Sequence, residues 1–495
     1  MRSTKPFPAL FARLLTGGLL LSSSAALAQF AEPEAVPLLT LTGGTPGDAY
    51  GWIGVPVGDL DGDGVQELIV GAQADSTGGT LAGRAYVYSG RTGALLRTVT
   101  GRPFDRLGYS VASVGDVDGD RVPDHVISGP GQPSQAPTHP GRAMLYSGRD
   151  GSVLREWSGE PASLFGDTVG APGDLDGDGT PDVLVGASFT SAAAFRVGRV
   201  YALSGRDGSV LWTREGAGER NLLGSSVNGL GDVSGDGVPD VIAGARNAGP
   251  SSGGLVYVLS GVDGAWLYTL QPDATAGDFG WFFANRAGDV NRDGVPDVYV
   301  GDFSDASLGT VGTGRAYVFS GRDGSRLLTL AATEAGEGLG VGRGAGDVNR
   351  DGHDDLIIGS YTSSAGAPGG GRVSVYSGRD GTVLRTLTGT VAGDLLGYDA
   401  WPMGDANGDG RPDFLITSAG RSSSGTGASS AYVIAGLPSP CPADLDGDRV
   451  VNHRDVRILA RALGDAGGPA DLDGNGTVQV ADLLLLLKAR GACAP

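Results

Sequence analysis

The sequence predicts an all-β protein: a seven-bladed β-propeller with four-stranded blades, followed by a small α-helical module. Three observations support this fold class. Glycine supplies 89 of the 495 residues and aromatic residues only 7%, which indicates a turn-rich chain. A Gly-Asp pair followed by an acidic cluster recurs at intervals of 57 or 58 residues. A shorter acidic repeat, with a spacing of 27 residues, occupies the C-terminus.

The first 28 residues have the pattern of a secretory signal peptide. Arg2 and Lys5 give a positive start, an apolar stretch follows over 9–21, and Ala26-Leu27-Ala28 supplies a small-x-small cleavage pattern. The alternative is an ordinary N-terminal helix. The apolar core is too short for a membrane-spanning helix, and no second long apolar segment follows. We therefore expect a mature chain that is secreted, extracellular or associated with the cell surface, without a membrane span.

The seven acidic repeats divide the next segment, 29–437, into units of four short β-like segments. The third unit contains an apolar run ending in glycine over 182–186, and the fifth contains an alternating run over 315–321. Short strands with turn residues between them favour sheets over helices. The Gly-Asp pairs begin at Gly58, Gly115, Gly173, Gly231, Gly288, Gly346 and Gly404.

The two ends of this array predict a closed ring rather than an open solenoid. A strand-like segment over 38–43 precedes the first Gly-Asp pair, whereas none follows the last alternating strand at 431–436. The N-terminal segment therefore supplies the missing outer strand of the last blade. This pairing removes two exposed sheet edges.

The acidic loops have the spacing of calcium ligands. In the third repeat, Asp174, Asp176, Asp178 and Asp182 stand at loop positions 1, 3, 5 and 9. Ca²⁺ takes six to eight oxygen ligands, whereas Mg²⁺ prefers a stricter octahedron with more water. His and Cys are absent from these positions, which argues against zinc. The alternative is that the Asp-Gly pairs only form hairpin turns, but a turn does not need four spaced acids.

All seven loops keep this pattern, with Ser or Asn at position 3 in the last four. Ser234 makes the fourth loop the weakest expected site. The other predicted ligands are Asp59, Asp61, Asp63, Glu67; Asp116, Asp118, Asp120, Asp124; Asp232, Asp236, Asp240; Asp289, Asn291, Asp293, Asp297; Asp347, Asn349, Asp351, Asp355; and Asp405, Asn407, Asp409, Asp413.

These motifs resemble the FG-GAP repeats that form the calcium-binding propeller of integrin α chains and of many bacterial surface proteins. The resemblance covers about 38–436 and rests on the Phe/Leu-Gly pair, the acidic loop and the alternating strand ending in Ser-Gly. It implies about seven Ca²⁺ ions, held in loops between the first and second strands of each blade. It also implies a ligand face at the opposite end, formed by loops such as 73–83, 130–141, 302–314 and 360–371.

The C-terminal module, 438–495, contains two loops with the twelve-residue spacing of an EF-hand. A helix is expected after each loop, with Val456, Leu459 and Leu463 on one face of the first helix and an apolar run over 483–487 in the second. Arg449 replaces the usual glycine of the first loop. The predicted ligands, for up to two Ca²⁺ ions, are Asp444, Asp446, Asp448, Asn452, Asp455, Asp471, Asp473, Asn475, Gln479 and Asp482.

This module resembles a type I dockerin, a pair of loop-helix units that binds a cohesin module on another protein. The resemblance implies a cohesin-type partner for 441–495, selected in part by His453-Arg454 and Val480-Ala481. The alternative is a self-contained calcium clamp without a partner. The chain's two cysteines, Cys441 and Cys493, bracket the module, and in an exported protein they predict a disulfide.

No catalytic constellation stands out in the sequence, and the acidic pairs are accounted for by calcium. The net charge of −20 disfavours nucleic acid, because such binders usually carry a basic patch. The leading hypothesis is a secreted, non-catalytic adhesion or scaffold protein with a protein or glycan ligand. One alternative is a lectin using Trp281, Phe282 or Trp401, although their place beside first strands favours the core. The other is an enzyme, since 200–212 faintly resembles quinoprotein dehydrogenase blades.

Overall fold

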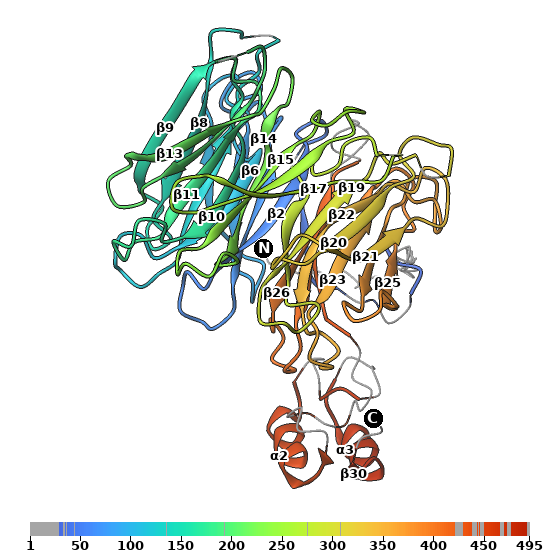
Figure 1. Ribbon diagram of the computed structural model, residues 1–495. Helices are drawn as coiled ribbons and strands as arrows, with labels where there is room; N and C mark the ends of the chain where they lie inside the picture. The colour runs from blue at the N-terminus through green and yellow to red at the C-terminus, as the bar shows by residue number, and fades with distance from the viewer. Residues whose placement is uncertain are drawn as a thin grey trace, which may run out of the picture.

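The computed structural model of the chain contains seven four-stranded antiparallel sheets, a two-stranded sheet and two C-terminal helices. The structure describes residues 29–495 apart from 33–34, 36, 44, 135, 193, 275, 307, 421–428, 438–442, 444, 446–449, 466–469, 473–476 and 493–495. The predicted signal peptide and both cysteines lie outside the described residues. Each four-stranded sheet is one blade of a propeller (Figure 1).

The first four blades follow the chain in order, with the first-named strand innermost. Blade 1 consists of β2 (Tyr50–Gly58), β3 (Glu67–Ala72), β4 (Arg84–Tyr88) and β5 (Leu95–Thr100). Blade 2 consists of β6 (Ser110–Gly115), β7 (Asp124–Gly129), β8 (Pro140–Tyr146) and β9 (Val153–Pro161). Blade 3 consists of β10 (Phe165–Gly173), β11 (Asp182–Ala187), β12 (Arg199–Leu203) and β13 (Val210–Glu215). Blade 4 consists of β14 (Leu223–Gly231), β15 (Asp240–Ala245), β16 (Leu255–Leu259) and β17 (Trp266–Leu270).

The last three blades repeat this order, and the last one takes its outer strand from the N-terminus. Blade 5 consists of β18 (Ala284–Gly288), β19 (Asp297–Asp302), β20 (Arg315–Phe319) and β21 (Arg326–Ala331). Blade 6 consists of β22 (Leu339–Gly346), β23 (Asp355–Ser360), β24 (Arg372–Tyr376) and β25 (Val383–Thr388). Blade 7 consists of β26 (Leu396–Gly404), β27 (Asp413–Ser418), β28 (Ser430–Ile434) and β1 (Pro37–Thr42).

The ring is closed, as the ends of the repeat array predict. The innermost strands contact one another in turn around the axis, and β26 of the last blade contacts β2 of the first. β1 pairs antiparallel with β28, with Leu41 opposite Ala431. The N-terminal strand therefore covers the edge that blade 7 would otherwise expose.

The burial of each strand explains its sequence pattern. The second strand of every blade, such as β11, is buried at every position, because neighbouring blades cover both of its faces. Such a strand begins with the buried acidic residue of position 9 and is mostly apolar after it, as in Asp182–Ala187. Outer strands such as β5 alternate between exposed and half-buried positions, because only one face packs inward.

The recurring glycines allow adjacent blades to approach closely. A Cβ atom on Gly186 in β11 would lie 2.1 Å from the carbonyl oxygen of Gly224 in the next blade. Gly224 has φ +89°, in the left-handed region that glycine adopts without strain. The Val-Gly pair of one blade and the Phe/Leu-Gly pair of the next blade are therefore the two sides of a single contact.

The two ends of the propeller carry different loops. The acidic loops join the first strand of each blade to the second, and the loops between the second and third strands lie at the opposite end. We call these ends the acidic-loop face and the opposite face. The backbone N–H of Gly436 donates a hydrogen bond to Asp413 of the last acidic loop, so the chain leaves the propeller on the acidic-loop face. The C-terminal helices lie beyond this end in Figure 1.

The C-terminal module forms the two predicted helices, α2 (His453–Ala462) and α3 (Val480–Lys488). A short pair of strands, β29 (Val450–Val451) and β30 (Gly491–Ala492), joins the start of the module to its end. Leu459 of α2 and Leu486 of α3 are fully buried in its small core, whereas Leu463 is 44% exposed and not the core residue that its spacing predicts. No helix among the described residues has the length and hydropathy to cross a bilayer.

Candidate functional site

The acidic loops of blades 1, 2 and 3 each bring three carboxylates together. Their oxygen atoms, from positions 1, 3 and 9, lie within 4.8 Å of one another in each cluster. In each loop, position 1 is half-buried, position 3 is exposed and position 9 is buried. The clusters could hold a metal ion, and they consist of Asp59, Asp61 and Glu67; Asp116, Asp118 and Asp124; and Asp174, Asp176 and Asp182.

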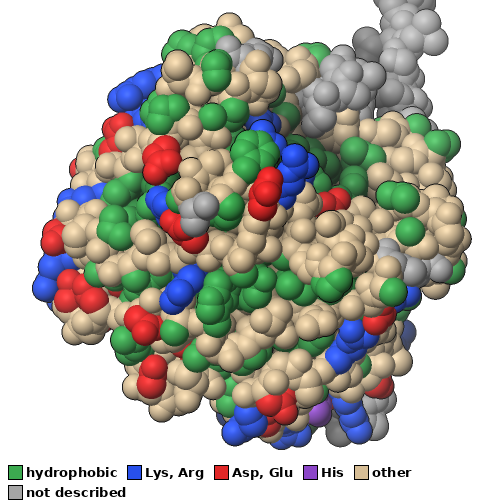
Figure 2. Space-filling model, turned by 45° about the horizontal axis from the view of Figure 1, so that its top comes forward, with side chains coloured by type: hydrophobic (Ala, Val, Ile, Leu, Met, Phe, Trp, Pro, Cys, Tyr) green, Lys and Arg blue, Asp and Glu red, His purple; other side chains and the backbone are tan. Residues whose placement is uncertain are grey.

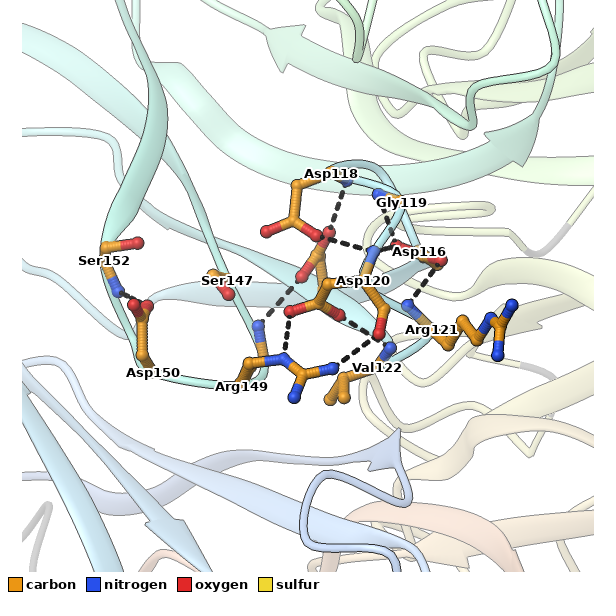
Figure 3. Close-up of polar contacts among 12 residues, drawn as sticks. Asp116, Asp118, Gly119, Asp120, Arg121, Val122, Ser147, Arg149, Asp150 and Ser152 are labelled. Carbon is orange, nitrogen blue, oxygen red and sulfur yellow. Dashed lines mark hydrogen bonds and ion pairs between the residues drawn. The ribbon is translucent and has the colours of Figure 1, made fainter.

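The loop backbone curls around the position 1 carboxylate, as Figure 3 shows for blade 2. The backbone N–H groups of Gly119 and Asp120 donate to Asp116 Oδ1 at 2.8 and 3.0 Å, and that of Arg121 donates to Oδ2 at 2.8 Å. Blades 1 and 3 make the same three bonds. A carboxylate oxygen has two lone pairs, so Oδ1 is fully used by its two N–H donors, whereas Oδ2 keeps one lone pair for a cation.

The position 9 carboxylate also has a structural role that the sequence reasoning missed. In blade 3, Asp182 is fully buried and accepts from the N–H of Leu175 at 2.7 Å and of Gly205 at 3.0 Å. The first bond holds the start of the loop, and the second holds the turn after the third strand. Equivalent pairs of bonds recur in blades 2, 4, 5, 6 and 7. This carboxylate therefore fastens the loop to its blade whether or not it also binds a metal.

Burial of the position 9 carboxyl groups destabilises their charged form relative to the protonated form. Desolvation, together with the nearby Asp61 and Asp63, raises the pKa of Glu67 to about 7. Burial likewise raises the pKa of Asp182 to about 6 and that of Asp413 to about 7. A cation placed between these carboxylates would offset this cost, because it favours the ionised form.

The position 5 carboxylates face an arginine. Arg149, in the turn between the third and fourth strands of blade 2, donates from Nε to Asp120 Oδ2 at 2.6 Å (Figure 3). The same ion pair forms in blades 1, 3 and 5, where Arg91, Arg206 and Arg322 lie 3.0–3.3 Å from the position 5 oxygen. The sequence signal was present, since this arginine recurs 28 or 29 residues after position 5, but the sequence reasoning did not connect it with the acidic loop.

Blades 4–7 place a neutral side chain at position 3, so positions 1, 3 and 9 offer two carboxylates and one amide or hydroxyl oxygen. In blade 5, Asn291 Oδ1 accepts from the N–H of Asp293 at 2.9 Å, while its Nδ2 donates to Asp293 Oδ2 at 3.2 Å. Ser234 Oγ of blade 4 donates to Asp232 Oδ1 at 3.4 Å. The position 1 carboxylates of these loops, Asp232, Asp289, Asp347 and Asp405, still accept the position 6 N–H on Oδ2, as in blades 1–3.

The predicted ligands of the C-terminal module are described only in part. Asp444, Asp446, Asp448, Asp473 and Asn475 lie outside the described residues. Asp455 and Asp482, at position 12 of each loop, are fully buried and accept from the N–H of Asn452 at 2.7 Å and of Gln479 at 2.8 Å. These bonds fix the first turn of α2 and α3.

The opposite face has a cavity of about 350 Å³ at the propeller axis. Trp281, Phe282 and Trp401 line it, and Trp401 also packs against the hydrophobic cores of blades 1 and 7, as its place beside a first strand predicts. Above it, seven aromatic rings form a closed circuit in which neighbouring centroids lie 5.2–5.9 Å apart, a range that favours tilted or edge-to-face contacts. The circuit, which we call the aromatic ring, consists of Trp52, Tyr109, Phe282, Trp281, Phe303, Tyr361 and Tyr398.

A buried ion pair stands below the aromatic ring. Arg343 Nη2 and Asp399 Oδ1 lie 2.6 Å apart, with the two side chains 9% and 5% exposed. The Arg343 guanidinium also lies 3.4 Å from the centroid of Trp401. Asp399 Oδ2 accepts from the Nε1–H of Trp401 at 3.1 Å, and Asn228 donates to Asn285 at 2.6 Å beside this pair. These contacts place a polar layer across the axial channel.

Parts of the chain match known repeat families. Residues 51–88, 165–203 and 344–376 match the FG-GAP repeat, and residues 199–300 match an FG-GAP-like repeat. Integrin alpha-8 of Gallus gallus is 32% identical over 240 residues, which cover 44% of this chain and 21% of that protein. Integrin alpha-PS2 of Drosophila melanogaster is 33% identical over 166 residues, covering 31% and 12% respectively. The chain thus spans only 12–21% of the length of these relatives.

Two solved structures also match the chain, each with a TM-score below 0.5. The crystal structure of BBS1N in complex with ARL6DN has a TM-score of 0.49 at 11% identity, and covers 81% of this chain and all of that one. The crystal structure of rhamnogalacturonan lyase YesW has a TM-score of 0.44 at 19% identity, covering 81% of this chain and 75% of that one. The repeat matches and the integrin relatives, together with the seven blades, support an FG-GAP, integrin α-like propeller.

Proposed function

We propose that this integrin α-like propeller is a secreted, calcium-stabilised and non-catalytic adhesion or scaffold protein. Its opposite face binds a protein or glycan ligand, and its C-terminal module docks to a cohesin-type partner. The observation that supports the proposal is that the two faces of the propeller present different kinds of side chain. One face repeats a carboxylate cluster from blade to blade, and the other gathers aromatic side chains around a cavity at the axis.

Calcium fits the acidic loops better than other ions. The donor set of each loop is made only of oxygen atoms, from carboxylates with one amide or hydroxyl in blades 4–7. A hard cation with six to eight flexible ligands suits such a set. About seven Ca²⁺ ions would occupy the propeller and up to two the C-terminal module, and each would join the first strand of a blade to the second.

The opposite face is the better candidate for ligand recognition. The aromatic ring side chains are half-buried and face a cavity, so a ligand can reach them. Figure 2 looks obliquely onto the end of the molecule away from α2 and α3. It shows hydrophobic side chains gathered in the hollowed middle of this end, beside charged side chains. Apolar clusters of this kind mark binding sites more often than solvated surface.

The C-terminal module presents apolar side chains that its small core does not cover. Leu484 is 55% exposed, Leu485 38% and Leu487 41%, all on α3, and Ile458 of α2 is 37% exposed. Exposed leucines on α3 and an exposed isoleucine on α2 favour a protein partner over a self-contained clamp. They support docking of a cohesin-type module.

Binding to arrays tests this proposal. The mature full-length protein would be applied to arrays of extracellular proteins, of glycans and of cohesin modules. Each array would be tested in calcium, after chelation, and after calcium is added back. We expect calcium-dependent capture by a protein or glycan and, separately, by a cohesin. A Leu484→Asp variant should lose only the cohesin signal. No capture on any array, or capture unchanged by chelation, would contradict the proposal.

A further inference from the structure

Blades 3 and 4 form a second cavity on the opposite face, outside the aromatic ring. It has a volume of about 310 Å³. Its walls come from the loop between β11 and β12, from the connection between β13 and β14, and from the loop after β15. We call it the arginine groove, and the side chains that define it are Phe189, Phe195, Arg196, Arg220 and Arg246.

The arginine groove is positively charged in a chain whose net charge is −20. Within the described residues, Arg196 and Arg246 have no carboxylate within 4.0 Å, and Arg220 approaches Glu219 only at 3.9 Å. Other arginines at this end of the molecule are neutralised, as Arg142 is by Asp105 at 2.7 Å. Glu219 lies 3.9 Å from Arg220 and the buried Asp167 lies near Arg246, so three guanidinium groups face two carboxyl groups and keep an excess of positive charge for an anion.

The guanidinium groups are held in place by aromatic rings. Arg196 lies 4.0 Å from the ring centroid of Phe189 and 5.1 Å from that of Phe195. Arg220, from the connection between β13 and β14, lies 5.6 Å from the centroid of the Phe195 ring. Stacking of this kind orients the guanidinium plane and leaves its N–H edge for a planar oxyanion. The Nε atom of Arg246 is also buried without a hydrogen-bond partner in the described structure.

The repeat itself shows that these arginines are not required by the fold. The backbone bonds from Arg220 to Phe195 and from Leu222 to Arg196 recur in blade 6, where Gly393 stands for Arg220 and Gly369 for Arg196. Arg196 has φ +51° and Arg220 φ +58°. Glycine adopts this left-handed conformation freely, whereas another residue is strained by about 1 kcal/mol. Blade 3 thus carries two strained arginines where blade 6 has glycine.

The arginine groove adjoins the aromatic ring through one contact. The guanidinium of Arg246 lies 4.0 Å from the centroid of Trp281, a member of that ring. Two side-chain donors around the axial cavity already have internal partners: Trp52 Nε1 donates to the Tyr109 carbonyl at 3.1 Å, and Asn285 Nδ2 donates to the Gly342 carbonyl at 2.8 Å. Neither donor is left for a sugar hydroxyl, whereas an apolar side chain against the aromatic ring needs no hydrogen-bond partner.

We propose that the arginine groove binds the carboxylate of an acidic peptide segment whose neighbouring apolar side chain lies against the aromatic ring. This inference rests on the proposed ligand-binding role of the opposite face and specifies the ligand as a peptide rather than a glycan. The net charge of −20 repels an acidic peptide at long range, so binding depends on the groove itself.

Fluorescence anisotropy with a defined probe tests this inference on the full-length protein in calcium. The probe is a fluorescein-labelled, C-terminally amidated peptide of alternating glutamate and phenylalanine, and its control has glutamine in place of every glutamate. We expect the acidic peptide to bind at least about tenfold more tightly than the neutral one, and added NaCl to weaken binding. Equal binding of the two peptides, or no binding at millimolar protein, would overturn the inference.

Three variants identify the groove as the site. Arg196 and Arg220 are exposed, so Arg196→Gln and Arg220→Gln should fold as the parent does, which the unfolding temperature verifies. Each should weaken the acidic peptide about tenfold, and Arg196→Lys should restore only part of the affinity because lysine lacks the planar fork. Arg457→Gln on α2 removes the same charge far from the groove and should leave affinity unchanged. Equal weakening by Arg457→Gln would show a general charge effect and contradict the inference.

A competition experiment separates the two ligand classes. A heparin-derived oligosaccharide that displaces the peptide and binds more tightly to the parent than to Arg196→Gln would overturn the peptide assignment. Array capture that persists in the Arg196→Gln variant, with no peptide binding in the parent, would refute this inference and leave the proposed function standing. Absence of all array capture would refute the proposed function.

Discussion

The two faces of the propeller differ in how faithfully they follow the repeat. On the acidic-loop face, a buried position 9 carboxylate holds the same two backbone segments in blade after blade. On the opposite face, blade 3 places arginines where blade 6 has glycines, and blade 5 contributes three adjoining aromatic residues at 281–283. The difference teaches that repetition marks the scaffold and departure from repetition marks recognition.

The largest expected effect comes from breaking the buried ion pair of the axial channel. Arg343→Leu leaves Asp399 charged and buried without its partner, and such a change costs about 3–5 kcal/mol of stability. The measurement is the midpoint of denaturant unfolding. Arg343→Leu combined with Asp399→Leu should recover most of the loss, because no unpaired charge remains. A double variant no more stable than Arg343→Leu would show that the pair is not the source of the loss.

The next effect concerns the buried carboxyl group of Asp167 on the opposite face, whose charged form is destabilised by burial. Burial raises the pKa of Asp167 to about 6, although Ser188 donates to it and Arg246 and Arg106 lie nearby. Because the folded-state pKa lies above the unfolded value of 3.8, the carboxyl favours folding below pH 4, and this contribution is lost as pH rises through 6. The free energy of unfolding of Asp167→Asn, relative to that of the parent, should therefore rise by up to about 3 kcal/mol between pH 4 and pH 7. Denaturant unfolding at each pH measures it, and a difference between the two proteins that stays constant over this range would contradict the prediction.

A smaller effect separates the fastening role of position 9 from metal binding. Asp240 of blade 4 accepts from the N–H groups of Val233 at 2.9 Å and Gly261 at 3.1 Å. Asp240→Asn should lower stability by about 2 kcal/mol even in chelator, because an amide cannot satisfy both N–H groups. The matched control is Asp263→Asn, at an exposed turn of the same blade. If Asp240→Asn loses stability only when calcium is present, position 9 is a ligand alone, and Asp263→Asn should change stability in neither condition.

The smallest effect concerns the arginine beside position 5. Arg149 is exposed and pairs with Asp120 at 2.6 Å, so Arg149→Gln should scarcely move the unfolding midpoint. It removes a positive charge next to the acidic cluster of blade 2 and should tighten cation binding by no more than about threefold. Calcium titration measures the change. Weaker binding would show instead that the arginine orients the carboxylate for the metal.

The acidic-loop face and the ring closure could be predicted from the sequence because they depend on local spacing repeated seven times. The extra strand-like segment before the first repeat, and the lack of one after the last, were sufficient to predict that β1 pairs with β28. The opposite face could not be predicted in the same way. Trp52 and Tyr398 meet at 5.5 Å although 346 positions separate them, and only ring closure brings them together. The arginine groove was hidden because Arg196 and Arg220 come from different loops and match no motif.

The most direct test of the calcium-built scaffold is the calcium content of the full-length mature protein, measured together with its thermal unfolding with and without chelator. The account predicts about seven ions in the propeller and up to two more in the C-terminal module, with a large fall in unfolding temperature after chelation. One ion or none per chain, with an unchanged unfolding temperature, would show that the acidic loops are only turns fastened by their own hydrogen bonds.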